Sequence, residues 1–105
     1  MGARHGPALR EVVAVVAALA GVRFGQVVVA LGCPDLLVRA LSAVTEAEDG
    51  TAHVVVSWEP PDLDTVARLL RPGGKAVVPA ATDATGWTTR YAESGWLVLG
   101  RTMPG

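Results

Sequence analysis

The chain has 105 residues, of which 50% are hydrophobic, a formal net charge of −1 and one cysteine, Cys33. This length and composition predict one compact domain over residues 1–105 with a sizeable core. Because there is no basic excess, we expect no nucleic-acid partner. A single cysteine rules out a disulfide or a cysteine cage within the chain and fits a reducing, cytoplasmic compartment.

An apolar run near the N-terminus, residues 12–20, raises the question of targeting. Basic residues precede it and its end resembles a signal-peptidase site, but Glu11 at its edge disfavours a cleaved signal. The run is also far shorter than the roughly 20 residues that cross a bilayer. We therefore expect no membrane association, and a retained helix over residues 7–20 that ends at Gly21.

Apolar runs and helical patterns alternate along the rest of the chain. They predict, in chain order, a strand over 27–31, a helix over 35–48 closed by Asp49-Gly50, a strand over 52–58, a helix from Asp62 or Asp64 to Leu70 and a strand over 75–79. Between the last two elements, Gly73 or Gly74 is expected to adopt a positive φ.

Residues 83–95 have two interpretations. They form either a helix from Asp83 to Ser94 or the first arm of a hairpin over 86–91 that turns at 93–95, followed in both cases by a strand over 96–101. We favour the helix. The resulting pattern predicts an α/β fold: a small Rossmann-like, mostly parallel sheet of about four strands with helices on both faces.

Two stretches resemble class I methyltransferases. Residues 70–78, LRPGGKAVV, are similar to the turn and strand "LRPGG.lvv" of that family, and residues 22–33, VRFGQVVVALGC, resemble its glycine-rich entry "lrpGdrVLDlGcG". The resemblance implies a loop after the first strand that would bind S-adenosylmethionine.

This loop departs from the family's pattern. Ala30 stands where the family has an acidic residue, Pro34 removes a backbone N–H, and Asp35 introduces a side chain, so only Gly32 survives in a vestigial loop over Gly32, Cys33, Pro34 and Asp35. The strand that would bind the ribose has no room before Ala52. The pattern is similar to non-catalytic relatives such as the N-terminal domain of anamorsin-type proteins, which implies no cofactor.

Several residues at the expected carboxyl edge of the sheet are candidates for chemistry. Cys33 precedes a helix, whose N-terminus would lower the thiol pKa, or else it is a small apolar residue filling a turn, which we favour. Clustered carboxylates at Asp35, Glu59, Asp62 and Asp83 would act as acid and base or hold a metal, although helix capping explains all but Glu59. His53 falls at the opposite end of its strand.

Aromatic residues are few and gather late in the chain at Trp87, Tyr91 and Trp96, with Trp58 in the expected substrate-facing loop. They form either a second small core or the anchors of an interface. The missing strands would leave one sheet edge uncovered, which favours a homo-oligomer or a complex with a protein partner.

Our leading hypothesis is a catalytically inactive methyltransferase-like domain that acts as a protein-interaction or assembly module, without cofactor or metal. The alternative is a small biosynthetic-pathway enzyme that reuses the pocket at the carboxyl ends of the strands, with Asp35, Glu59 and Cys33 as candidate catalytic residues. A third is a protein that retains weak nucleotide affinity. The sequence does not separate the three.

Overall fold

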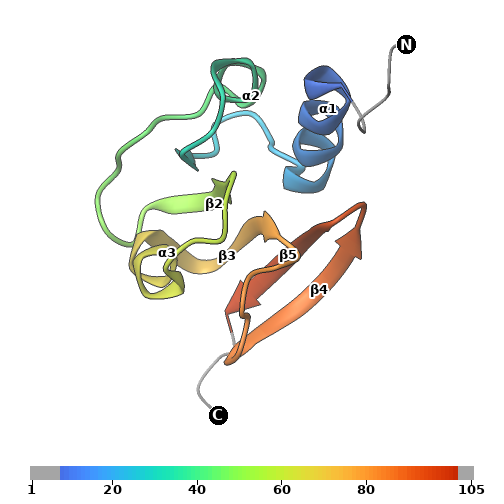
Figure 1. The fold of residues 1–105 in the computed structure, drawn as a ribbon. Helices are drawn as coiled ribbons and strands as arrows, with labels where there is room; N and C mark the ends of the chain where they lie inside the picture. The colour runs from blue at the N-terminus through green and yellow to red at the C-terminus, as the bar shows by residue number, and fades with distance from the viewer. Residues whose placement is uncertain (1–7, 102–105) are drawn as a thin grey trace.

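A five-stranded mixed sheet forms the centre of the chain, which the computed structural model describes over residues 8–101 (Figure 1). Its strands are β1 (Val28–Leu31), β2 (Ala52–Ser57), β3 (Leu70–Pro79), β4 (Trp87–Glu93) and β5 (Trp96–Arg101), in the order β1-β2-β3-β5-β4. The helices are α1 (Leu9–Ala20), α2 (Asp35–Leu41) and α3 (Leu63–Leu69). No helix in this described range is long and apolar enough to cross a bilayer.

Strand direction changes across the sheet. β1, β2 and β3 are parallel, whereas β5 runs antiparallel to both of its neighbours, β3 and β4. The prediction of a mostly parallel sheet of about four strands is therefore wrong. A parallel neighbour for β3 needs a crossover connection, usually a helix, but the segment between β3 and β5 contains the strand β4 and no helix, so the chain returns as a hairpin.

The favoured helix over residues 83–94 is wrong, and the hairpin interpretation is confirmed. Ser94 and Gly95 both have positive φ, 54° and 87°, which is the conformation of a two-residue turn that suits the twist of a hairpin. β4, which precedes this turn, contains Trp87, Thr88, Thr89 and Tyr91, and tryptophan, threonine and tyrosine all favour strands.

The second helix is shorter than expected, ending at Leu41 instead of Glu48. Ser42 adopts a left-handed conformation, φ 51°, which stops the helix. The chain then runs beside β1, where the N–H of Val44 donates to the carbonyl of Val28 at 2.9 Å and the N–H of Ala30 donates to the carbonyl of Val44 at 2.8 Å. Part of the edge that we expected to be uncovered is thus covered by the chain itself.

Side chains pack on both faces of the sheet, because the central strands carry β-branched residues at consecutive positions. On one face, α1 and α2 cover a core that includes Val16, Leu37 and Val56. On the other face, Val66 of α3 packs in a second core with Val55. Figure 1 shows the β4–β5 hairpin extending beyond the region that the helices cover.

The segment over residues 71–74 loops out of the β2–β3 ladder, since Ala52 pairs with Leu70 but Val54 pairs with Lys75. Gly73 has a φ of 81°, which confirms the expected positive φ in this turn. Gly74 is buried, and a Cβ added there would lie 2.9 Å from Cδ2 of Leu70. Both glycines are therefore required by the local backbone, for different reasons.

Candidate functional site

A hollow of about 260 Å³ lies where the parallel strands β1 and β2 end. Leu31 pairs with Ser57, so the carboxyl ends of the two strands are level and the loops that follow them face each other. This is the edge at which open α/β sheets place their ligands. The hollow is lined by Leu31, Gly32, Ser57, Glu59, Pro60, Pro61, Asp62 and Thr65.

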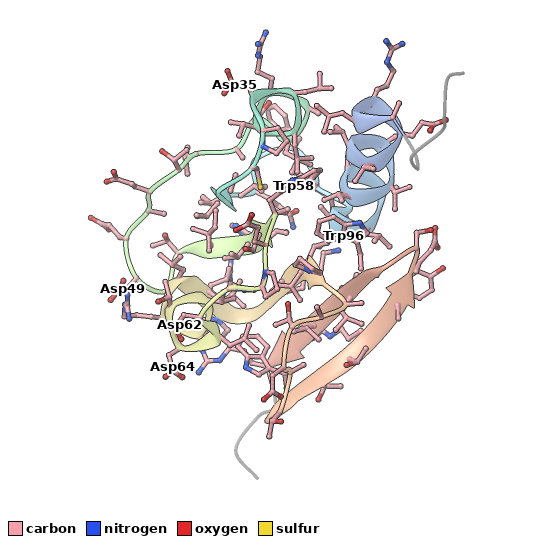
Figure 2. The ribbon with its side chains drawn as sticks, in the orientation of Figure 1. Asp35, Asp49, Trp58, Asp62, Asp64 and Trp96 are labelled. Carbon is pink, nitrogen blue, oxygen red and sulfur yellow. The ribbon has the colours of Figure 1, made fainter. Side chains whose placement is uncertain are left out.

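Three of the residues that we singled out there, Gly32, Glu59 and Asp62, line the hollow, whereas Cys33, Asp35 and Asp83 do not. Asp35 is exposed in the first turn of α2, and Figure 2 shows it far from Asp62, which lies beside α3. The structure therefore does not bring Asp35, Glu59 and Cys33 together. Across residues 8–101, no group of three or more histidine, cysteine or carboxylate side chains is placed to hold a metal ion.

The carboxylates mostly serve local backbone structure. Asp62 is the N-cap of α3, as expected, and accepts hydrogen bonds from the N–H of Asp64 at 3.1 Å and from the hydroxyl of Thr65 at 3.2 Å. Asp83 does not cap a helix; it accepts from the N–H and the hydroxyl of Thr85, and these bonds lower the pKa of its carboxyl. Pro34, not Asp35, occupies the N-cap position of α2.

Ser57 is a lining residue to which the sequence analysis gave no role. Its side chain is buried, and its hydroxyl donates a hydrogen bond to the backbone carbonyl of Glu59. The sequence feature that could have identified it is its position, as a polar residue at the end of an otherwise apolar strand. This bond orients the loop after β2 and leaves the carboxylate of Glu59 exposed at the rim of the hollow.

Cys33 has the environment of a packing residue. Its Sγ lies 3.5 Å from the carbonyl oxygen of Val56 and 3.7 Å from that of Leu31, and the side chain packs against the core under α1 and α2. Burial raises the pKa of the thiol above its ordinary value. Desolvation outweighs the backbone hydrogen bonds at Leu31 and Trp58, which lower this pKa. The structure thus does not support the alternative in which the thiol pKa is lowered.

Chemically, the hollow presents hydrogen-bonding groups and two exposed carboxylates, Glu59 and Asp62, beside a proline pair. No known family, curated protein or solved structure matches this chain. His53 does not contribute to the hollow. As expected, it lies at the other end of β2, where its Nδ1 accepts from the N–H of Val27 at 2.9 Å and its Nε2 lies 2.8 Å from Nη1 of Arg71.

The four aromatic candidates do not form one surface. Trp96 is 9% exposed and packs against Trp58, with ring centroids 5.5 Å apart and planes tilted by 47° (Figure 2). Trp87 packs against the core on the opposite face of the sheet. Tyr91 is 52% exposed, and its hydroxyl donates to Glu93 at 2.6 Å. Trp96 is thus a core residue, and Tyr91 is the most exposed of the four.

β4 lies at one edge of the sheet. β4 ends the strand order and pairs with β5 alone, and six of its seven residues are exposed. Its register shifts between Thr89 and Tyr91, so Arg90 forms a bulge. The strand contains no proline, but the bulge and the charged residues Arg90 and Glu93 are also devices that limit pairing at such edges.

Proposed function

We propose that this chain is a catalytically inactive relative of class I methyltransferases that acts as an assembly module, and that it forms a homodimer through antiparallel pairing of β4 with β4 of a second copy. The observation that carries this proposal is the exposed seven-residue edge strand. The resemblance of residues 70–78 and the vestigial loop at Gly32 support the relationship. The single cysteine fits a cytoplasmic setting.

The partner of β4 is taken to be a second copy of this chain, because an edge strand can pair antiparallel with an identical strand. Two identical strands related by a twofold axis present the same donors and acceptors to each other, which makes a closed, symmetric contact. The other edge of the sheet is partly occupied by the segment around Val44, so pairing at β4 does not continue into a filament. Tyr91, half exposed on this strand, would add an aromatic contact at the interface.

The hairpin geometry identifies a residue that tests this pairing. With Ser94 and Gly95 as the two-residue turn, Glu93 and Trp96 form the hydrogen-bonded pair that closes the hairpin. Hydrogen-bonded and non-bonded pairs alternate in an antiparallel ladder, so Ala92 directs its N–H away from β5. An Ala92→Pro substitution removes a donor from the free edge while the hairpin keeps its own bonds.

Light scattering at tens of micromolar should show a dimer for the wild-type chain and for Ala92→Val, which keeps the N–H. Ala92→Pro should run as a monomer with the far-ultraviolet circular dichroism of the wild type. A monomeric wild-type chain at this concentration, or an Ala92→Pro variant that dimerises as well as Ala92→Val, contradicts pairing at β4.

The second candidate function is ligand binding or catalysis in the hollow at the ends of β1 and β2, and the position of Glu59 favours it. Its carboxylate is exposed at the rim and makes no side-chain hydrogen bond within the described range, which leaves it available to a ligand or to a proton-transfer step. A screen of small metabolites by thermal shift tests this function. A ligand that stabilises the wild type but not Glu59→Gln would support this function. If the wild type binds such a ligand and is also monomeric, ligand binding replaces assembly as the proposed function.

A further inference from the structure

Lys75 is the most enclosed cation described in the chain, and two glycines make room for it. It lies on β3, and its cross-strand neighbour on β5 is Gly100. Its ammonium nitrogen reaches the end of α1, where it lies 3.2 Å from the position that a Cβ on Gly21 would occupy. The side chain is half-buried, and burial is the first cause that lowers the pKa of Lys75.

Arg90 lies beside Lys75 on the same face of the sheet. It belongs to the bulge of β4, and its guanidinium group covers Gly100, where an added Cβ would collide with Nε of Arg90. Since Gly100 is the direct partner of Lys75, the two cationic side chains flank one glycine. The glycine at this position is what allows the arginine to lie flat against the strand.

Arg23 is the third cation of this group. It follows the end of α1 by three residues, and its positive charge, after that of Arg90, further lowers the pKa of Lys75. Arg23 and Arg90 are both exposed, so solvent reaches the group from these two side chains. We call Arg23, Lys75 and Arg90 the cationic triad.

The triad lacks acidic partners in the part of the chain that the structure describes. The one ion pair within residues 8–101 joins Arg68 and Asp49, and residues 1–7 and 102–105 contain no aspartate or glutamate. The carboxyl end of α1 contributes roughly half a negative charge, which offsets only a small part of three full positive charges. The triad therefore holds a local excess of positive charge in a protein whose net charge is −1.

We infer that the cationic triad is a binding site for a dianionic phosphoryl group, carried by free phosphate or by a small phosphate monoester. A guanidinium fork binds two oxygens of such a group at once, and the ammonium of a lysine binds it as a point charge. A dianion fits three cations better than a carboxylate does, because it leaves one uncompensated positive charge instead of two. This site shares β4 with the edge pairing proposed above through Arg90, but the observations that support it are separate ones.

Titration of the isotope-labelled chain with inorganic phosphate, followed by amide chemical shifts at constant ionic strength set with chloride, tests this inference. Saturable shifts are expected at Gly21, Arg23 and Gly100, with a dissociation constant on the order of 1 mM. Sulfate should compete, and acetate should bind at least about tenfold more weakly. Glycerol 3-phosphate distinguishes the two sources: tighter binding than phosphate assigns the site to a monoester, and equal binding assigns it to free phosphate.

Two variants, Arg90→Gln and Lys75→Met, should each weaken phosphate binding by roughly tenfold. Arg10→Gln is the matched control, because it makes the same charge change on α1 about 16 Å from Gly21. A thermal readout separates binding from folding. Without phosphate, Arg90→Gln should melt at a higher temperature than the wild type because it relieves repulsion. Added phosphate should raise the melting temperature of the wild type and of Arg10→Gln more than that of Arg90→Gln.

Three results would overturn the phosphate site. The first is the absence of saturation at concentrations well above the expected dissociation constant. The second is an equal loss of affinity in Arg10→Gln and Arg90→Gln, which would indicate general charge attraction. The third is acetate binding as tight as that of phosphate, which would exclude a site selective for a dianion.

Discussion

Replacement of Trp96 by alanine is the sharpest test of how this fold is stabilised. Trp96 is 9% exposed and packs in the core beneath α1, with its ring against Trp58. Truncation of a buried tryptophan to alanine removes apolar contacts and leaves a cavity, at a cost of about 3–5 kcal/mol. Because domains of this size are stable by only about 5–15 kcal/mol, the variant should be near the limit of folding.

Urea unfolding followed by circular dichroism measures this effect. With a slope of about 2 kcal/mol per molar urea, the midpoint for Trp96→Ala should fall by roughly 2 M. Trp96→Phe keeps an aromatic ring beside Trp58 and should cost about 1–2 kcal/mol. The samples are compared at about 1 μM, because association would otherwise add a concentration-dependent term.

Tyr91→Ala is the control, since Tyr91 is half exposed on the edge strand and its removal should change the free energy of unfolding by about 0.5 kcal/mol or less. The opposite pattern would refute the reasoning. If Trp96→Ala keeps the wild-type midpoint and only shifts the oligomeric state, Trp96 is an interface anchor and not a core residue.

Three further predictions concern the turn, the thiol and the vestigial loop. Gly74→Ala should destabilise the fold by about 1–3 kcal/mol because its Cβ would collide with Leu70, and Gly73→Ala by about 1 kcal/mol through its positive φ; unchanged thermal melting of both variants would contradict this account of the turn. Iodoacetamide should alkylate Cys33 more slowly at neutral pH than in the chain unfolded by guanidinium, because burial raises the thiol pKa, and the rate should increase as the pH rises towards that pKa; a faster rate in the folded chain would indicate an activated thiolate. Calorimetry should detect no S-adenosylmethionine binding, since the loop at Gly32 retains one glycine and lacks the preceding acid, and a dissociation constant below about 100 μM would disprove that interpretation.

Local signals predicted several elements closely. The helix ending at Ala20 and the β-branched runs of β1 and β2 appear within a few residues of their expected bounds. Asp62 caps α3 as its position before an apolar pattern indicated. These features depend on neighbouring residues alone, through helical spacing, capping and strand propensity, and are therefore readable from short stretches of sequence.

The ends of elements were harder to predict where distant partners decide them. The pattern of residues 35–48 is compatible with a longer helix, but hydrogen bonds from Val44 to β1 hold that segment extended. Similarly, residues 83–94 show no strong helical or strand periodicity, and residues 87–93 form a strand because they pair with β5. In both cases tertiary hydrogen bonds outweigh a small difference in local propensity.

The sequence by itself determined the single buried layer of central strands, the helices that cover it and the glycine turn at residue 73, because each follows from periodicity or from a backbone conformation that only glycine adopts readily. Only the tertiary structure decided the antiparallel hairpin, the burial of Trp96, the separation of Asp35 from Glu59 and the position of Arg90 over Gly100, the cross-strand partner of Lys75. The physical reason is that these features depend on which distant residues share a sheet face or a strand end. Strand order sets those neighbours, and no local pattern encodes strand order.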